Sequence, residues 1–297
     1  MRVSSGQLNQ IVLQGLRQQD KSYADVMTQM SSGLRINRIS DDPLGTVSLI
    51  GLEREQTSYQ QYRDNATRVM SRMEQSETYL DTSFNALLRV QDLALAASND
   101  SATNDDRQAL ASELRTLKDT LVNFANARDE EGNYLFSGSQ LGTAPVSDTG
   151  AGLAYQGDNL RREVPVAQGV TLAANETIES VYFNGGNFFT DLENFITDLE
   201  TGSTTLDTTG PAMLDAIDRT VNGIGQKLTE VGSRIKSAKS LDMAQEDLAL
   251  TNEKIRGKIR DLDYLDAMGR VSQIELAMNT TQKTYSKLSQ LSLFNHL

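Results

Sequence analysis

Side chains suited to acid–base or nucleophilic chemistry are scarce in this sequence. His296 is the only histidine among 297 residues, and there is no cysteine. A serine triad needs a histidine that activates the nucleophile, and a helical zinc-protease motif needs two histidines. We therefore interpret His296, which lies close to Phe294 in the sequence, as part of a terminal packing helix. No catalytic residue, metal ligand or cofactor-binding residue is predicted, and the chain is not expected to be an enzyme.

Two pairs of adjacent acidic residues raise the question of calcium binding, and two glycine clusters that of phosphate binding. The pairs are Asp41–Asp42 and Asp105–Asp106, and neither has the spaced oxygen ligands of a calcium loop. Capping of a helix N-terminus explains both pairs more simply. The glycine clusters, Gly185–Gly186 and Gly223–Gly225, lack the lysine and hydroxyl residue of a phosphate loop. We interpret them as a turn and as close helix packing.

The charge balance excludes two further classes of partner. The chain has 40 acidic and 28 basic side chains, which gives a net charge of −12. Nucleic acids and anionic membrane surfaces both attract basic proteins, so neither is expected as a partner. No apolar stretch approaches the roughly 18 residues that a membrane span needs, and the first residues have no apolar signal-peptide core. Secretion would therefore use a route without a cleaved signal peptide.

Helical periodicity dominates both halves of the chain. Apolar residues spaced alternately by three and four, the pattern of a coiled-coil seam, run through the first half. This seam comprises Tyr59, Tyr62, Ala66, Val69, Met73, Ser76, Leu80, Phe84, Leu87 and Gln91. Asn104 or Asp105 is expected to cap a further helix, and Pro211 to open a second long helix. The seam of that helix comprises Leu214, Ile217, Val221, Ile224, Leu228, Val231, Ile235 and Ala238, and it continues with Leu241, Ala244, Leu248, Thr251, Ile255 and Leu262.

The segment 134–187 has a different character. Glycines cluster there, short alternating stretches such as 153–155 and 163–166 appear, and turn signals separate them, which predicts a small β-rich module. The expected fold is therefore mainly α with a small β-rich insert, in which the N- and C-terminal halves form a long antiparallel helical, coiled-coil rod. The expected division is 1–39 with 258–297 as a terminal coiled-coil assembly part, 40–133 with 188–257 as the helical rod, and 134–187 as the β-rich outer part.

The two ends of the chain are poor in charge. Arg17 is the only charged residue between Val3 and Gln19, and only three lie between Val271 and Leu297. A solvated helix normally carries a charged outer face, so an amide-rich helix with an apolar stripe indicates burial on several sides, as in a polymer. The predicted assembly residues are Leu8, Ile11, Leu16, Tyr23, Val26, Met30 and Leu34 in the N-terminal helix, and Ile274, Met278, Tyr285, Leu288, Leu291, Leu293 and Phe294 in the C-terminal helix.

Several motifs resemble those of the flagellins and their relatives. Ser31–Asn37, followed by Asp41–Pro43, resembles the motif near the N-terminus of that family, and Leu291–Leu297 resembles its C-terminal ending. Gly132–Gly138 and Tyr155–Asp158 resemble the helix-to-β junction and the inserted module of the hook-associated protein 3 branch. The residues that carry the family motif are Gly33, Arg35, Asn37, Asp41, Asp42 and Pro43, and those of the junction are Gly132, Tyr134, Leu135, Phe136 and Gly138.

This resemblance implies a structural subunit of the bacterial flagellum that joins the hook to the filament and is required for motility. It implies export by the flagellar type III apparatus, with an export chaperone at the C-terminal region, and an extracellular position at the hook–filament junction. The implied partners are further copies of the chain in a ring, hook-associated protein 1, flagellin and, transiently, the cap protein. The lack of cysteine agrees with unfolded export, because disulfides would obstruct it.

Two other functions remain open at this point. A short flagellin that forms the filament itself would share the segment Val231–Arg234, but flagellins usually have alanine at the position of Pro43 and lack the Tyr134–Gly138 element. A coiled-coil binding protein, such as a secreted adhesin-like module, would have no reason to hide charge-poor ends. Phe136 is interpreted either as ordinary core of the β module or as part of a rigid junction that fixes the module to the helices.

Overall fold

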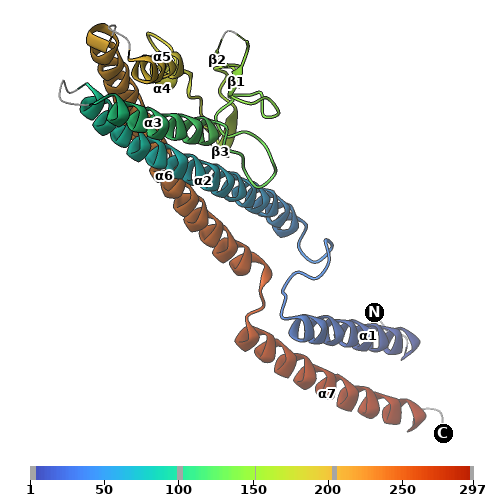
Figure 1. Cartoon of the computed structure of the whole chain (residues 1–297). Coiled ribbons are helices and arrows are strands. Elements are labelled where there is room, and N and C mark those ends of the chain that lie inside the picture. Colours follow the sequence, from blue (N-terminus) through green and yellow to red (C-terminus); the bar gives the residue numbers. More distant parts are fainter. Residues whose placement is uncertain (1–4, 99–102, 151, 203–205, 295–297) are drawn as a thin grey trace. The chain divides into compact units, whose positions relative to one another are not determined.

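The computed structural model describes residues 5–98, 103–150, 152–202 and 206–294 (Figure 1). Helices dominate it and four short strands interrupt them, so the predicted mainly α fold with a small β-rich insert is confirmed. The helices are α1 (Ser5–Ser32), α2 (Pro43–Ala97), α3 (Asn104–Ala125), α4 (Glu179–Tyr182), α5 (Phe188–Thr201), α6 (Leu206–Arg260) and α7 (Tyr264–Phe294). The strands are β1 (Val146–Asp148), β2 (Leu153–Tyr155), β3 (Glu163–Ala167) and β4 (Val170–Ala173).

The chain forms two compact units. The terminal unit consists of Met1–Ser58 and Leu248–Leu297, and the central unit consists of Tyr59–Asp247. The long helices α2 and α6 each contribute residues to both units. The terminal unit contains both ends of the chain, and the central unit contains all four strands.

Local sequence signals set the helix boundaries. Asp42 caps α2 as predicted, because its Oδ1 accepts a hydrogen bond from the amide of Gly45 at 2.8 Å. The cap of α3 is Thr103 rather than Asn104 or Asp105, since Thr103 and Asp106 form a reciprocal capping box. Helix α6 begins at Leu206 and contains Pro211, which was expected to open it. A proline near a helix start removes few hydrogen bonds, because the first turn has no internal amide partners.

In the central unit, two rows of seven-residue spacing form the core of the helix pair. Five buried α2 residues and five buried α6 residues make up these rows, namely Ala66, Met73, Leu80, Leu87 and Ala94, and Ile217, Ile224, Val231, Ala238 and Gln245. The predicted α2 seam holds as far as Leu80, after which Ser83 and Val90 are buried and Phe84 and Gln91 are half-buried. The core widens there because α3 packs beside α2, with the rings of Tyr79 and Phe124 6.3 Å apart.

Helices α3 and α5 complete this core. Leu114 and Leu121 of α3 are fully buried, and so are the predicted α5 residues, Leu192, Phe195, Ile196 and Leu199. Asn187 caps α5 through its side chain, and Gly202 ends it with a left-handed backbone at φ 62°. The rings of Phe188, Phe189 and Tyr182 stack beside one another, and burial of each such side chain stabilises the fold by roughly 1.5–3 kcal/mol.

The β-rich insert consists of two separate two-stranded antiparallel sheets, β1–β2 and β3–β4. An isolated hairpin is only marginally stable in water, so each sheet depends on its packing against helices. Val146 of β1 and Val166 of β3 are buried in this way. Asn65 of α2 holds β3 by donating a 2.7 Å hydrogen bond to the carbonyl of Pro165.

Candidate functional site

The two ends of the chain pair in the terminal unit, where α1 and α7 run antiparallel. Gln19 Nε2 donates to Thr281 Oγ1 at 3.4 Å, while Tyr264, at the start of α7, donates its hydroxyl to the carbonyl of Met30 at 3.1 Å. Between these contacts, Arg270 Nη2 donates to the side-chain oxygen of Gln29 at 2.6 Å. The pairing therefore combines polar bridges with a narrow apolar seam.

The seam is thin for helices of this length. Val26 and Ala267 are buried, whereas the predicted residues Leu16, Tyr23, Met30, Leu34, Ile274, Met278 and Tyr285 are only half-buried. Ile11 is 64% exposed, so it does not belong to the seam within one chain. The side chains of Leu8, Leu288, Leu291, Leu293 and Phe294, together with His296, lie outside the described part of the structure. The role of these residues in assembly stays a prediction.

The family-motif residues fasten the two chain segments that leave α1 and α6. Gly33, with φ 72°, ends α1 in a left-handed conformation, and its carbonyl accepts the amide of Leu262 at 2.9 Å. The amide of Arg35 donates to the carbonyl of Arg260 at 2.7 Å. The Arg35 guanidinium also donates to the carbonyl of Ile259, at 2.8 Å from Nη2 and 3.1 Å from Nε. Arg35 thus supplies donors to the end of α6, where carbonyls have no intrahelical partner.

The rest of the motif shapes the loop before α2. Asp41 accepts backbone amides from Asn37 and Arg38, at 3.1 and 2.9 Å, which closes a tight turn. Asn37 Nδ2 donates back to the carbonyl of Leu34 at 3.1 Å. Pro43 is the first residue of α2, where its missing amide hydrogen has no consequence. The acidic pair at 41–42 therefore serves turn formation and capping.

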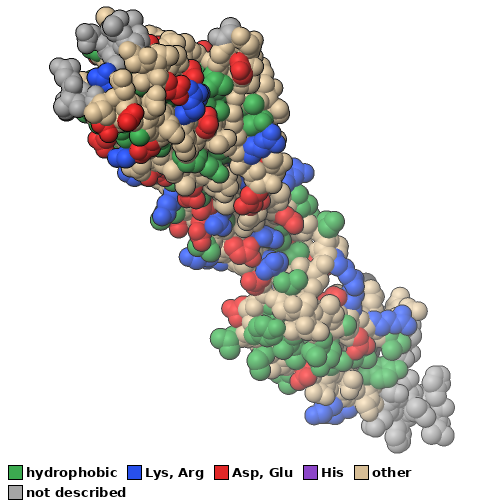
Figure 2. Space-filling model, viewed as in Figure 1, with side chains coloured by type: hydrophobic (Ala, Val, Ile, Leu, Met, Phe, Trp, Pro, Cys, Tyr) green, Lys and Arg blue, Asp and Glu red, His purple; other side chains and the backbone are tan. Residues whose placement is uncertain are grey.

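Hydrophobic side chains are exposed mainly in the terminal unit. Of the 19 large hydrophobic residues exposed in the described chain, 14 belong to that unit. They are Ile11, Leu13, Met27, Ile39, Leu44, Val47, Ile50, Leu248, Leu250, Ile255, Tyr264, Leu265, Met268 and Leu276. Figure 2 shows such side chains on one face, over the region of α1 and α7 in Figure 1. The predicted continuation of the α6 seam fails here, because Ala244, Leu248, Thr251 and Ile255 are exposed.

Exposure of this kind marks surfaces that other proteins cover. Monomeric soluble proteins rarely expose large contiguous apolar areas, and areas of this kind mark interaction sites. The buried positions in this part of α6 are instead polar: Gln245 and Asn252 are 5% and 3% exposed. The apolar residues of α6 beyond Asp247 therefore face away from the intrachain core and remain free for contacts with other chains.

The predicted junction segment lies in the core of the central unit. Leu135 and Phe136 are 0% and 2% exposed, and the amide of Leu135 donates to the carbonyl of Ala127 at 3.0 Å. Arg72 of α2 donates to the carbonyl of Tyr134 at 2.8 Å and forms an ion pair with Asp129. These contacts connect the segment to α2 and to the end of α3.

Two glycines permit the turns of this segment. Gly132 and Gly138 have φ of 84° and 72°, a conformation that other residues rarely adopt. A Cβ atom at Gly138 would lie 2.1 Å from the carbonyl oxygen of Asp158. The junction motif and the Tyr155–Asp158 motif therefore pack directly against each other.

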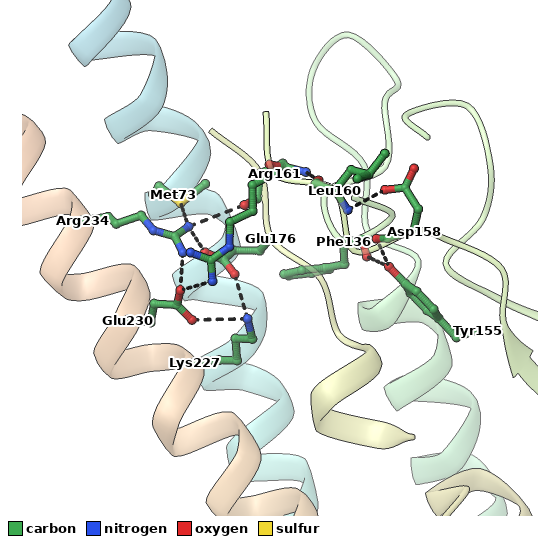
Figure 3. A network of polar contacts seen from close by, with 11 residues as sticks. Met73, Phe136, Tyr155, Asp158, Leu160, Arg161, Glu176, Lys227, Glu230 and Arg234 are labelled. Atoms are coloured by element: carbon green, nitrogen blue, oxygen red, sulfur yellow. Dashed lines mark hydrogen bonds and ion pairs between the residues drawn. The ribbon is translucent and has the colours of Figure 1, made fainter. Parts of the chain in front are cut away.

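Tyr155 and Asp158 hold the junction from the β side (Figure 3). The Tyr155 hydroxyl lies 3.2 Å from the carbonyl oxygen of Phe136 and 3.0 Å from that of Asp158. Burial, assisted by nearby carboxylates, raises the pKa of Tyr155, so this hydroxyl stays a donor at neutral pH. Asp158 accepts the backbone amide of Ser139 at 2.7 Å, and this bond lowers its pKa.

A buried ion-pair network attaches the insert to α6 (Figure 3). The side chain of Glu176 is 2% exposed and pairs with Arg234 and with Lys227, the latter at 3.2 Å. Glu230 pairs with the same two cations and with Arg161 at 2.8 Å. Sequence reasoning noted the segment Val231–Arg234 without assigning a role to Arg234. The only sequence signal was that a charged residue accompanies an apolar helix seam.

Comparison with known proteins identifies the family. Residues 3–141 match the bacterial flagellin N-terminal helical region. Flagellar hook-associated protein 3 of Escherichia coli is 24% identical, and the alignment covers 99% of each chain. A flagellin of Clostridium tyrobutyricum is 30% identical over 47% of this chain and 37% of that protein. A solved structure from Vibrio parahaemolyticus, assigned as a flagellar hook-associated protein, is 31% identical over 74% of this chain and all of that one, with a TM-score of 0.71.

The chain belongs to the flagellar hook-associated protein family. It is a structural component of the bacterial flagellum, an extracellular appendage, and not an enzyme. Within the described residues, no helix is both long and apolar enough to cross a membrane. The polar contacts of the motif residues are therefore those of a structural protein: they position helices and turns, and the exposed apolar surfaces are where this family member meets its neighbours.

Proposed function

We propose that this hook-associated family member is the subunit that joins the flagellar hook to the filament and assembles as a ring. The observation that carries the proposal is the alignment with hook-associated protein 3, which extends over nearly the whole of both chains. Alignment with a flagellin covers less than half of each chain. In this function the chain would lie between hook-associated protein 1 and flagellin, and would contact the cap protein transiently.

The distribution of exposed hydrophobic residues supports self-association through the terminal unit. Each of those residues that a neighbouring copy covers would contribute roughly 1.5–3 kcal/mol to assembly. We propose 1–39 with 258–297 as the assembly part, 40–133 with 188–257 as the rod and 134–187 as the outer part. A thin α1–α7 seam suits ends that gain their stability from neighbouring subunits.

The same features agree with delivery by the flagellar type III apparatus without a cleaved signal peptide. A chain without cysteine forms no disulfide that would block passage as an unfolded polypeptide. An export chaperone would bind the C-terminal region, where Leu265, Met268 and Leu276 are exposed in the folded chain. Covering these residues before export would prevent premature association.

Deletion of the gene in the source organism tests the proposal. Electron microscopy of the cells, together with a blot for flagellin in the medium, should show hooks without filaments and flagellin released as monomer. Bare hooks with no flagellin in cells or medium would make the chain a flagellin. Normal filaments and swimming would contradict both functions, provided that the genome holds no second copy.

A further inference from the structure

A cavity between α2 and the β3–β4 sheet has no place in the function described so far. Its volume is about 670 Å³, and it lies entirely within the central unit. Three arginines line it: Arg68 and Arg72 from α2, and Arg162 from the chain just before β3. Polar side chains, Gln61, Asn65, Ser71 and Gln75, form much of the remaining wall, and Asp129, Glu130 and Glu131 line one part of it.

The arginines are held in place by neighbouring groups. Asn65 is only 6% exposed; its Oδ1 accepts Arg68 Nη2 at 2.5 Å while its Nδ2 binds the carbonyl of Pro165. The backbone amide of Arg162 donates to Asn175 Oδ1 at 2.8 Å, which fixes the base of that side chain. Arg72 is fixed by Asp129 and by the carbonyl of Tyr134. The cavity is therefore a preformed arrangement of donors.

Much of this positive charge is not neutralised within the chain. Among the described residues, no carboxylate lies within 4.0 Å of the guanidinium of Arg68 or of Arg162, and Arg72 Nε is a buried donor with no partner. Burial lowers the pKa of Arg72, and the charge of Arg162 lowers it further, so the two cations lie close enough to repel each other. An anion in the cavity would relieve that repulsion and would accept the free donors.

The charge distribution of the chain indicates where such an anion comes from. The terminal unit has 13 basic and 11 acidic residues, a net charge of +2, whereas the central unit has 15 basic and 29 acidic residues, a net charge of −14. Neighbouring copies in a ring would bring several such acidic surfaces together, and like charges at close range are destabilising. A basic cavity on the same unit offers those carboxylates a partner of opposite sign.

We propose that the cavity bounded by Arg68, Arg72 and Arg162 is a contact between subunits, which binds carboxylate side chains from the central unit of a second copy of this chain. This inference rests on the proposed ring assembly and adds to it a specific electrostatic contact outside the apolar terminal unit. Arginine suits the task because its planar fork can bind both oxygens of one carboxylate.

Charge reversal with a matched control tests the contact. R68E/R162E and K236E/K239E change the net charge equally, and all four side chains are exposed and without an ion pair among the described residues. Each variant is expressed in the deletion strain, and its amount on isolated hooks is measured by quantitative blot. We expect R68E/R162E to reduce incorporation about tenfold, equivalent to roughly 1.4 kcal/mol, and K236E/K239E to leave it close to wild type. Urea unfolding of both purified variants, expected to match wild type, separates assembly from folding.

The possible results distinguish the inference from the proposed function. If the wild-type chain is absent from isolated hooks, the proposed function itself is wrong. If wild type is present and the two double variants incorporate equally, whether both normally or both poorly, the cavity makes no specific contact and the inference is overturned. Citrate binding to the purified monomer that R68Q/R162Q abolishes, combined with normal incorporation of R68Q/R162Q, would assign the cavity to a small anion instead.

The occupant can be identified directly because the chain has no cysteine. Ser71→Cys places a single thiol at an exposed position of the cavity wall, to which a benzophenone maleimide can be attached. Irradiation of assembled flagella should crosslink it to an acidic peptide from residues 59–247 of another copy, and R68E/R162E should abolish that product. A crosslink to a different flagellar protein, or one confined to a single chain, would overturn the assignment.

Discussion

Glu176 offers the sharpest test of how the β-rich insert is attached to the helices. Its side chain is 2% exposed and lies between Arg234 and Lys227, whose side chains are 11% and 13% exposed. Glu176→Gln keeps the size of the side chain and removes its charge, which leaves two largely buried cations with one fewer anion. Breaking a buried ion pair by removing one partner costs about 3–5 kcal/mol.

The expected loss lies at the lower end of that range. Glu230 stays in place, 3.3 Å from Lys227, and it still neutralises part of the charge. We therefore expect Glu176→Gln to lower the free energy of unfolding by about 3 kcal/mol. Higher ionic strength should leave most of this difference, because salt screens buried pairs poorly.

Equilibrium urea unfolding, followed by circular dichroism at neutral pH, measures the change as a shift of the midpoint at constant slope. Glu113→Gln is the matched control, because Glu113 and its partner Arg89 are 43% and 53% exposed. Such a surface pair contributes about 0–1 kcal/mol. If Glu176→Gln costs no more than Glu113→Gln, the ion-pair network does not hold the insert, and the apolar packing of the Leu135–Phe136 segment alone does so.

Three further predictions follow from single features. Gly138→Ala should destabilise the chain by about 2–4 kcal/mol, because of its positive φ and the 2.1 Å approach to Asp158, whereas Gly142→Ala, with open space around it, should stay within about 0.5 kcal/mol in the same urea assay. Burial raises the pKa of Tyr182 from 10.0 to about 12, so the unfolded chain loses this proton first and stability should fall between these pH values. The fall should be about 2.7 kcal/mol and absent in Tyr182→Phe. In the monomer, proteases should cut first within residues 1–39 and 260–297; protection of both ends in a verified monomer would contradict the thin α1–α7 seam.

The periodic elements were predictable, because apolar spacing in a helix reports directly which face is buried. The α2 seam up to Leu80, the α3 and α5 faces and the strands at 153–155 and 163–166 all follow from that signal. Boundaries were less accurate where two residues compete for one role, as with Thr103 and Asn104. Pro211 misled for a similar reason, since a proline is tolerated a little beyond the start of a helix as well as at it.

The long-range polar contacts could not be predicted from the sequence. Arg35 lies far in sequence from its acceptor Ile259, and Arg72 lies far from Tyr134, and no periodicity reports such pairs. The resemblance to a known family singled out Arg35 and Tyr134 as motif residues, but only the structure gives them partners. The cavity arginines were missed altogether, because Arg68 and Arg162 are surface residues in a sequence whose overall charge is negative.

The last third of α6 shows how this chain limits its own stability. At seven-residue steps the buried positions change from Ile217, Ile224 and Val231 to Ala238, and then to Gln245 and Asn252. The apolar area buried per turn therefore falls along the helix, and the stabilisation from that burial falls with it. Asn252 donates to the carbonyl of Leu52 at 3.1 Å, but its own side-chain oxygen is buried without a partner.

A buried unpartnered acceptor costs about 1–3 kcal/mol, so Asn252→Leu should stabilise the folded monomer by about 1 kcal/mol or more. Slower hydrogen exchange of the α6 amides beyond residue 247 would show this gain directly. A buried polar residue in a helix pair can also fix the axial register, and its loss then permits alternative alignments. Asn252→Leu should consequently incorporate into flagella less well than wild type despite its greater stability. Equal or better incorporation would mean that Asn252 has no role in register.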